Sequence, residues 1–117
     1  MRGKLSMLAA STLLAVSLLA GGAAQPAHAT VVTKVVKMTN TLRFMPMTIT
    51  IHKGDRIKWK NVSTGGLQHT TTSRHWNSGA LSPGQTFVHT FRTIGTFRYH
   101  CTFHSAEGMT GKIIVAP

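Results

Sequence analysis

Past the N-terminal segment, apolar and polar positions alternate in short runs. Met47, Ile49 and Ile51 are separated by polar residues, and Ile57 and Trp59 lie among charged ones. Alternation with a period of two is typical of strands that bury one face. The same pattern recurs at Phe87 and Phe91, at Phe97, Tyr99 and Cys101, and at Ile113 and Val115. We therefore predict an all-β domain of seven or eight short strands, arranged as a sandwich.

Turn-forming residues separate these runs. Lys53-Gly54-Asp55 is predicted to join two strands as a hairpin, and Ser82-Pro83-Gly84 fits a turn with Pro second and Gly third. Gly65-Gly66 and Asn77-Ser78-Gly79 indicate loops. Residues 62–84 are the least regular stretch, and a short helical turn is compatible with them. Nothing in the pattern indicates repeats or a second domain.

The first 29 residues have the layout of a secretory signal. Arg2 and Lys4 precede an apolar segment over 5–20, and Ala27-His28-Ala29 forms an A-x-A cleavage site. The apolar segment is short for a membrane span. We predict cleavage after Ala29, a mature domain over 30–117 and export to the periplasm or the extracellular space, without stable membrane insertion after cleavage. An uncleaved anchor is the alternative.

The chain is strongly basic. It has 13 Lys and Arg against 2 Asp and Glu, for a formal net charge of +11. The cations are spread singly rather than in runs, and an export signal argues against nucleic acid as the partner. An acidic protein or an anionic membrane surface is a better candidate. The simpler alternative is that the positive charge only keeps the surface solvated and binds no specific partner. We expect the protein to be a monomer.

A soft donor set lies near the C-terminus in "YHCTFHSAEGMTGKIIV", residues 99–115. Cys101 is the only cysteine, His104 follows three residues later, and Met109 follows five after that. Thiolate, imidazole and thioether together favour copper over magnesium or calcium. A second histidine would complete the donors of a blue-copper site. His69, in "GGLQHTTTS", is the best candidate, because it follows a Gly-Gly turn in a loop that can lie beside the other.

Other residues could be placed at this site on sequence grounds. His89 is an alternative ligand. Because it lies two residues after Phe87, it is expected on the same face of the strand, which favours a histidine packed in the core. Glu107 could replace Met109. His100 points away from Cys101 by strand alternation but could lie on an electron path. Trp76 could form part of an apolar docking patch or pack within its loop. Met38, Met45 and Met47 could form a copper-loading cluster, although packing is favoured for them.

Long stretches of the chain resemble the cupredoxin family. They are "FMPMTITIHKGDRIKWKN", then His69, then "SPGQTFVHTFRTIGTFRYHCTFHSAEGMTGKIIV". The Cys-x2-His-x4-Met spacing and Gly-Met-x-Gly-Lys-Ile are similar to plastocyanins, and the resemblance covers residues 38–116. It implies a Greek-key β-sandwich with one type 1 copper ion near one end. It also implies that His69, Cys101, His104 and Met109 are the ligands, with the edge of His104 at a solvent-facing apolar patch.

The chain departs from plastocyanins at several positions. The segment between His69 and Cys101 is shorter. Thr70 stands where plastocyanins have Asn, which leaves open whether a hydrogen bond ties the two ligand loops. His100 replaces a Tyr, and the acidic patches of plant plastocyanins have no counterpart. We therefore expect a different partner surface.

Three classes of function remain to be weighed. The first is a soluble type 1 copper protein that shuttles single electrons between redox partners, one of them with an acidic docking surface. The second is a copper-binding or copper-delivery protein without a redox role. The third class, a copper oxidase or reductase, is disfavoured. Such enzymes resemble one another in a His-Cys-His sequence, whereas here Thr102 follows Cys101, and the chain lacks a second sandwich. Zinc is disfavoured because methionine is a poor zinc ligand.

Overall fold

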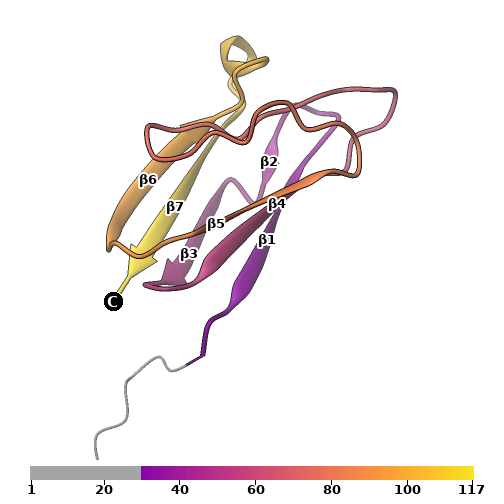
Figure 1. Cartoon of the computed structure of the whole chain (residues 1–117). Coiled ribbons are helices and arrows are strands. Elements are labelled where there is room, and N and C mark those ends of the chain that lie inside the picture. The colour runs from indigo at the N-terminus through magenta and orange to yellow at the C-terminus, as the bar shows by residue number, and fades with distance from the viewer. Residues whose placement is uncertain (1–29) are drawn as a thin grey trace, which may run out of the picture.

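The protein is a two-layer β-sandwich in a computed structural model that describes residues 30–117 (Figure 1). The predicted signal segment, 1–29, lies outside the described residues. Within them, no helix has the length and apolarity needed to cross a membrane. The elements are β1 Thr33–Met38, β2 Phe44–Met45, β3 Thr48–His52, β4 Arg56–Asn61, β5 Thr86–Thr90, β6 Gly95–His100, the 3-10 helix η1 Ser105–Glu107 and β7 Thr110–Ala116.

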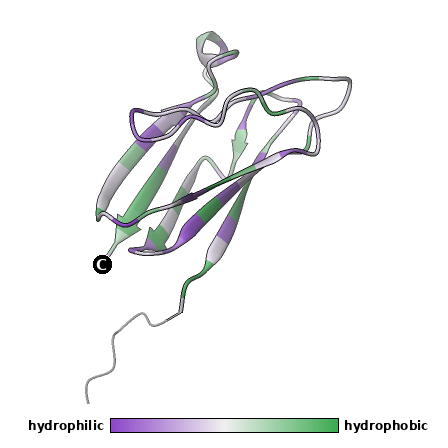
Figure 2. Cartoon of the chain, viewed as in Figure 1, coloured by the Kyte–Doolittle hydropathy of each residue, from purple (hydrophilic) through white to green (hydrophobic). Residues whose placement is uncertain are grey.

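Within residues 30–117, seven strands form two sheets, which confirms the all-β prediction. One sheet has the order β2-β1-β4-β5 and the other has the order β3-β7-β6. Two pairings, β1 with β4 and β3 with β7, are parallel, so each sheet joins segments distant in sequence. Apolar and polar bands alternate along the strands (Figure 2). The buried positions of β4, for example, are Ile57, Trp59 and Asn61.

The segment 53–55 corrects the sequence prediction, because it is not a hairpin. β3 belongs to the sheet with β7 and β6, whereas β4 belongs to the sheet with β1 and β5. The turn therefore carries the chain from one layer to the other. Period-two alternation fixes which face of a strand is buried but does not say which sheet the strand joins. Here Ile51 and Ile57, both fully buried, approach the same core from opposite layers.

An aromatic cluster fills the space between the layers. Trp59 is fully buried, and its ring lies 5.4 Å from those of both Trp76 and Tyr99. Phe44 packs edge-on against Tyr99 at 4.6 Å, and Phe91 packs edge-on against Trp76 at 5.3 Å. Trp76 is only 6% exposed, so the structure supports the packing role and not the docking-patch role for this residue.

The irregular stretch between β4 and β5 holds no helical turn; the one 3-10 helix among the described residues lies after Cys101 instead. One isolated bridge pairs His69 with Leu81 within the stretch, and a second pairs Thr72 with His100 and so attaches the stretch to β6. The second bridge fixes the loop that carries His69 beside the end of β6. The predicted turns are present: Gly65, Gly66 and Gly84 all have positive φ, and the Gln85 N–H bonds the Ser82 carbonyl.

Candidate metal centre

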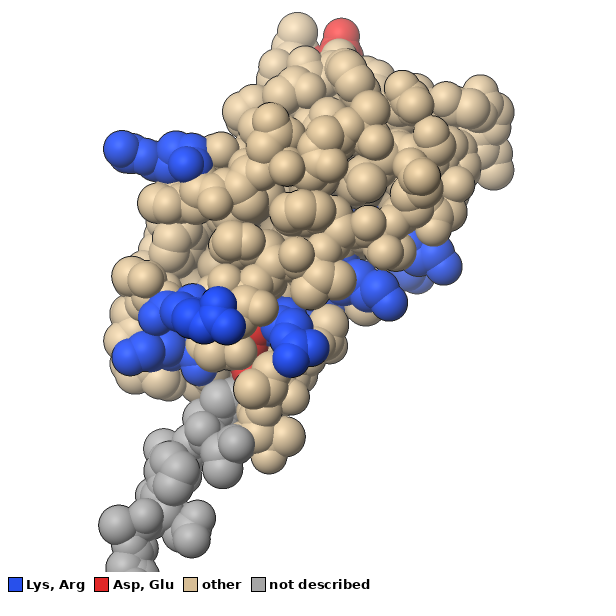
Figure 3. Space-filling view, viewed as in Figure 1, with Lys and Arg blue, Asp and Glu red and all other residues tan. Residues whose placement is uncertain are grey.

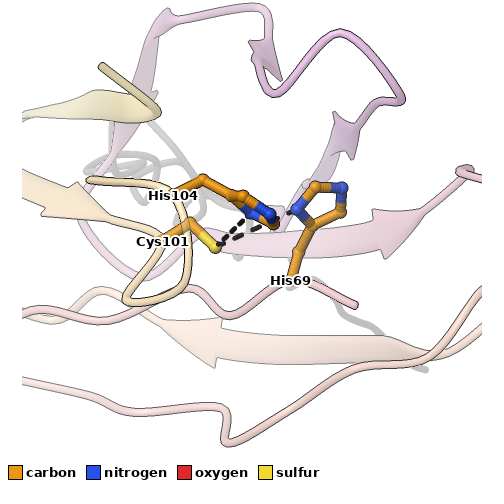
Figure 4. A group of neighbouring side chains, drawn as sticks. All are labelled: His69, Cys101 and His104. Atoms are coloured by element: carbon orange, nitrogen blue, oxygen red, sulfur yellow. Dashed lines mark hydrogen bonds between the residues drawn. The ribbon is translucent and has the colours of Figure 1, made fainter. Parts of the chain in front are cut away.

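Three of the four predicted site residues converge at one end of the sandwich. The Sγ atom of Cys101 lies 3.5 Å from Nδ1 of His104 and 3.9 Å from Nδ1 of His69. The donor atoms of all three lie within 4.8 Å of one another, and in Figure 4 both Nδ1 atoms face the sulfur. Cys101 and His69 are fully buried, whereas His104 is half-buried.

Cys101 lies directly after β6. Side chains alternate between the two faces of a strand, so Cys101 points to the same inner face as Phe97 and Tyr99, toward the core. Its sulfur accepts a hydrogen bond from the main-chain N–H of Thr70 at 3.3 Å. This contact holds the sulfur beside the loop that carries His69.

His69 is held in one tautomer by the far side of its ring. Nε2 lies 3.1 Å from the main-chain oxygen of Thr39 and 2.9 Å from Oγ of Ser63. A carbonyl oxygen only accepts, so Nε2 must carry the proton and Nδ1 presents its lone pair toward Cys101. Burial first, and then the neighbouring His104, lower the pKa of His69, although the bond to Thr39 opposes them. A lowered pKa favours the neutral imidazole that a metal ligand must be.

His104 reaches the site from a tight loop. The Gly108 N–H bonds the Ser105 carbonyl, and Gly108 adopts the left-handed conformation, with φ of 84°, that ends η1. Main-chain bonds from the His104 N–H to Cys101 and from the Met109 N–H to His104 close the loop. On its solvent side the ring borders a shallow hollow of about 430 Å³. The other lining residues are Gly65, Gly66, Leu67, Gln68 and Phe103.

Met109 lies at the start of the return toward β7. Its side chain is fully buried, and its main-chain oxygen accepts a hydrogen bond from the Cys101 N–H at 3.0 Å. The structure therefore brings the Met109 backbone directly beside the Cys101 backbone, within the buried cluster that also contains the cysteine. Glu107, the alternative to Met109, is exposed on η1.

The donor spacing fits a single metal ion. Metal–sulfur and metal–nitrogen bonds of roughly 2.3 and 2.0 Å, the values for zinc, place two ligands about 3.7 Å apart when they are about 120° apart. The two observed sulfur–nitrogen distances, 3.5 and 3.9 Å, bracket that value. One soft thiolate and two imidazoles in a trigonal arrangement are the donors of a copper site.

The comparisons with known proteins agree with this chemistry. Residues 29–116 match the profile of a family described as copper binding proteins, plastocyanin/azurin family. The chain belongs to this copper-binding family. The cupredoxin resemblance is thereby confirmed, copper is its cofactor, and membership agrees with the prediction that the chain is not an enzyme.

Curated relatives include two algal plastocyanins. The chloroplastic protein of Chlamydomonas reinhardtii is 30% identical over 102 residues, which cover 76% of this chain and 69% of that protein. The chloroplastic protein of Tetradesmus obliquus is 33% identical over 90 residues, which cover 66% of this chain but only 61% of that protein. A protein of Rubrivivax gelatinosus named copper-resistant cuproprotein CopI is 29% identical over 106 residues, covering 68% of this chain and 64% of that protein.

Solved structures share the fold of this cupredoxin. A purple cupredoxin from Nitrosopumilus maritimus superposes with a TM-score of 0.64 at 21% identity, covering 71% of this chain and 99% of that one. A mutant of amicyanin in the oxidised state gives 0.62 at 22% identity, covering 70% and 80%. At these identities the likeness shows the β-sandwich alone.

In this cupredoxin, Thr70 resolves the question that its substitution for Asn left open. Its hydroxyl oxygen accepts a hydrogen bond from the Thr102 N–H at 2.9 Å and contacts the hydroxyls of Thr72 and Thr102. The residue after the first histidine therefore still ties the two ligand loops together, by a shorter side chain.

The structure places the remaining candidates of this cupredoxin away from the sulfur. His89 packs against Trp76 at 5.0 Å and Phe91 at 4.8 Å, so it lines the aromatic core. His100 lines the outer face of β6, in a hollow shared with Met47. Met38 is buried in the core, whereas Met45 and Met47 are 52% and 46% exposed, so a place in the core holds for Met38 alone.

Asn61 is a supporting residue of this cupredoxin that the sequence did not reveal. Its amide donates to the main-chain oxygens of Leu67 and Leu81, and its side-chain oxygen accepts from the Ser63 N–H. Fully buried, it fixes both segments that pair around His69. The available signal was a polar residue at an inward position of an alternating strand, because buried amides are hydrogen-bonded.

Proposed function

We propose that this protein carries single electrons on copper held by His69, Cys101 and His104, with Met109 as the axial ligand. The observation that carries the proposal is the convergence of a buried thiol and two imidazoles, one of which also borders a surface hollow. When bound, copper supplies a one-electron couple between Cu(I) and Cu(II).

The protein holds these donors in place before any metal arrives. The ring of His69 is fixed by Thr39 and Ser63, and the sulfur of Cys101 is fixed by the Thr70 N–H. Because Ser63 and Thr70 are buried and Thr39 is half-buried, the ligands have little room to move when the charge of the metal changes. Small rearrangement is what fast electron transfer requires, and a catalytic role would instead require an open coordination position.

The electron leaves at the edge of His104. The hollow beside this ring is lined by two glycines, Leu67, Gln68 and Phe103, of which Leu67 and the 52% exposed Phe103 offer apolar contact to a partner. A thin apolar contact brings the imidazole close to a partner's redox centre and excludes water from the interface. The segments 62–71 and 101–109 contain no Lys or Arg and one acidic residue, Glu107, so the basic charge of the protein lies outside this contact.

The net positive charge acts at longer range. It attracts a redox partner with an acidic surface and raises the association rate, and this rate falls as salt is added. The proposed protein acts as a monomer after export, in the periplasm or outside the cell, with residues 1–29 as its secretory signal. Support for export comes from the basic, apolar and A-x-A pattern of that segment.

Spectra of the copper-loaded protein test the proposal. We expect an intense visible thiolate-to-copper band and the narrow copper hyperfine splitting of a type 1 site in the electron paramagnetic resonance spectrum. Cys101→Ser should abolish the band, whereas His100→Gln, a neighbour outside the donor set, should retain it. A band that survives in Cys101→Ser would exclude this site.

Copper delivery is a second candidate, and the match to a copper-resistance protein favours it specifically. The same ligands would serve, so the two functions differ in exchange rather than in structure. An electron carrier should retain copper through many cycles of oxidation and reduction in the presence of a competing Cu(I) chelator. Rapid loss of copper to the chelator would favour delivery.

A further inference from the structure

The outer face of the sheet β2-β1-β4-β5 carries an ordered basic and apolar pattern. The registers place Met45, Lys37 and Lys60 side by side in one row. A second row runs Val35, Lys58 and Val88. Arg56 follows in a third row, between Thr33 and Thr90. We call the seven residues Val35, Lys37, Met45, Arg56, Lys58, Lys60 and Val88 the basic face.

The cations of the basic face are not neutralised by the protein. The whole chain has only two acidic residues, Asp55 and Glu107. Asp55 is 1% exposed, and its carboxylate accepts hydrogen bonds from the main-chain N–H groups of Val32 and His52. Glu107 lies on η1, beside the candidate metal centre. Four positive charges therefore lie on two adjacent strands, and the one acidic residue near them is the buried Asp55, which precedes Arg56 in the chain.

The apolar members of the basic face are exposed to solvent. Met45 is 52% exposed, Val88 is 46% exposed and Val35 is 45% exposed. They alternate with lysines across the sheet, so each apolar side chain has a cationic neighbour. Such a surface suits a ligand that offers negative charge and a nearby apolar layer together.

The basic face lies apart from the end where electrons exchange. Figure 3 shows blue side chains across the lower part of this view and along its right side, whereas the top, where the loop 101–109 lies, shows none. None of the seven residues of the basic face lines the hollow beside His104. A ligand bound there would leave the His104 hollow open.

The shape of the basic face favours a planar ligand over a protein side chain or peptide. None of the seven residues lines any of the three hollows described for the molecule, which lie on the opposite sheet, around His89 and beside His104. The strands of the face are short and present one layer of side chains. A lipid surface needs no groove, whereas an acidic peptide gains specificity from one.

We propose that the basic face binds the surface of anionic phospholipid membranes. The lysines and Arg56 contact the headgroups, Val35, Met45 and Val88 reach the boundary of the acyl layer, and the metal centre stays free at the side. This is a reversible surface attachment and not an insertion of the chain. The proposal does not depend on electron transfer, so copper-free and copper-loaded protein should bind equally.

Vesicle sedimentation tests the proposal on the protein purified after expression with its own N-terminal segment. The vesicles are phosphatidylcholine alone or a mixture in which about one lipid in three is phosphatidylglycerol. We expect binding to the anionic vesicles only, weakening as salt rises. The triple variant in which Lys37, Lys58 and Lys60 are all changed to Gln should bind roughly 100-fold more weakly, because each cation near an anionic surface raises the affinity roughly fivefold.

A matched variant separates the face from the net charge. Replacing Lys53, Arg74 and Arg98 together with Gln removes the same charge from exposed positions outside the basic face. It should weaken binding only a few-fold, and equal loss in both triple variants would overturn the proposal. Val35→Ser combined with Val88→Ser should weaken binding several-fold while keeping its salt dependence; unchanged binding would exclude contact with the acyl boundary.

Two further outcomes overturn the proposal. One is no binding to anionic vesicles at low salt while the visible copper spectrum shows a folded protein. The other is binding to polyglutamate, but not to vesicles, with the same dependence on Lys37, Lys58 and Lys60; this result would assign the face to an acidic protein partner. Failure in either way leaves the spectroscopic test of the copper site unaffected.

Discussion

The hydroxyl oxygen of Thr70 accepts a hydrogen bond from the main-chain N–H of Thr102 at 2.9 Å. Together with the bond from the Thr70 N–H to the sulfur of Cys101, this contact joins the loop of His69 to the loop of Cys101 and His104. Both loops leave the sandwich at the same end, and in the described residues the Thr72–His100 bridge is the nearby backbone link between them. The geometry of the candidate site therefore depends on a side chain that does not itself face the metal position.

Replacing Thr70 with Val tests this dependence. The variant keeps the shape of the side chain but leaves the Thr102 N–H without its acceptor, which costs about 1–2 kcal/mol. We expect a lower free energy of unfolding, measured by urea denaturation, and faster loss of copper to a chelator. Thr70→Ser keeps the hydroxyl and is the control. If both variants released copper at the same rate, the hydrogen bond would not be what holds the loops.

Replacing Met109 with Gln tests the proposed axial ligand. An amide oxygen is a harder donor than a thioether and favours Cu(II), so the reduction potential should fall while copper is retained. Direct electrochemistry measures the shift. Met47→Gln, which changes a methionine that is 46% exposed, should leave the potential unchanged. An unaltered potential in Met109→Gln would remove Met109 from the donor set.

The pH dependence of stability should depend in part on His89. Burial first, and then the nearby His75 and Arg92, lower the pKa of His89. The unfolded chain therefore takes up this proton more readily than the folded protein does, so His89 favours folding above pH of about 6.5 and this contribution is lost as pH falls. His69, whose pKa is also lowered, adds a second contribution of the same sign in the copper-free protein.

Urea denaturation of the copper-free protein at about pH 8 and about pH 5 measures this effect. His89→Gln should lose less stability than the original protein between these two values, and the remainder should come from His69. Equal losses in the two proteins would mean that His89 titrates alike in the folded and unfolded states.

Gly111 is required by the ring of Tyr99. A Cβ atom at this position would overlap the Cζ and hydroxyl of Tyr99, which lies opposite Gly111 in the β6–β7 register. Gly111→Ala should therefore destabilise the protein by about 1–3 kcal/mol through overpacking of the core. Thr110→Ala, one residue earlier and exposed, should change the stability by less than about 0.5 kcal/mol. Thermal denaturation of both variants measures the two changes in stability. Equal stability of the two variants would contradict the predicted overlap with Tyr99.

Much of the fold and of the candidate site could be predicted from the sequence. Alternating burial along β4 and β7 followed the apolar pattern closely, because one face of each strand packs into the sandwich. The spacing of Cys101 and His104 indicated their proximity, since a strand end and a tight loop bring such donors together. His69 needed a guess about which loop lies opposite, and the structure places its ring beside them.

The rest depended on contacts that local patterns do not encode. The turn at 53–55 resembled a hairpin, because the alternation of apolar and polar residues does not indicate which sheet a strand joins. Asn61 and Thr70 act through partners distant in sequence or in an adjacent loop. Met45 and Met47 flank Pro46 at a change of layer, where an apolar residue has no regular inward side, and both are exposed.

The place of β7 in its sheet has a consequence for how the chain is made. β7 lies between β3 and β6, so that sheet has no central strand until residues 110–116 have left the ribosome. Long-range pairings of this kind form late and slowly. The β3-β7-β6 layer of the sandwich therefore cannot be completed before residues 110–116 have been synthesised.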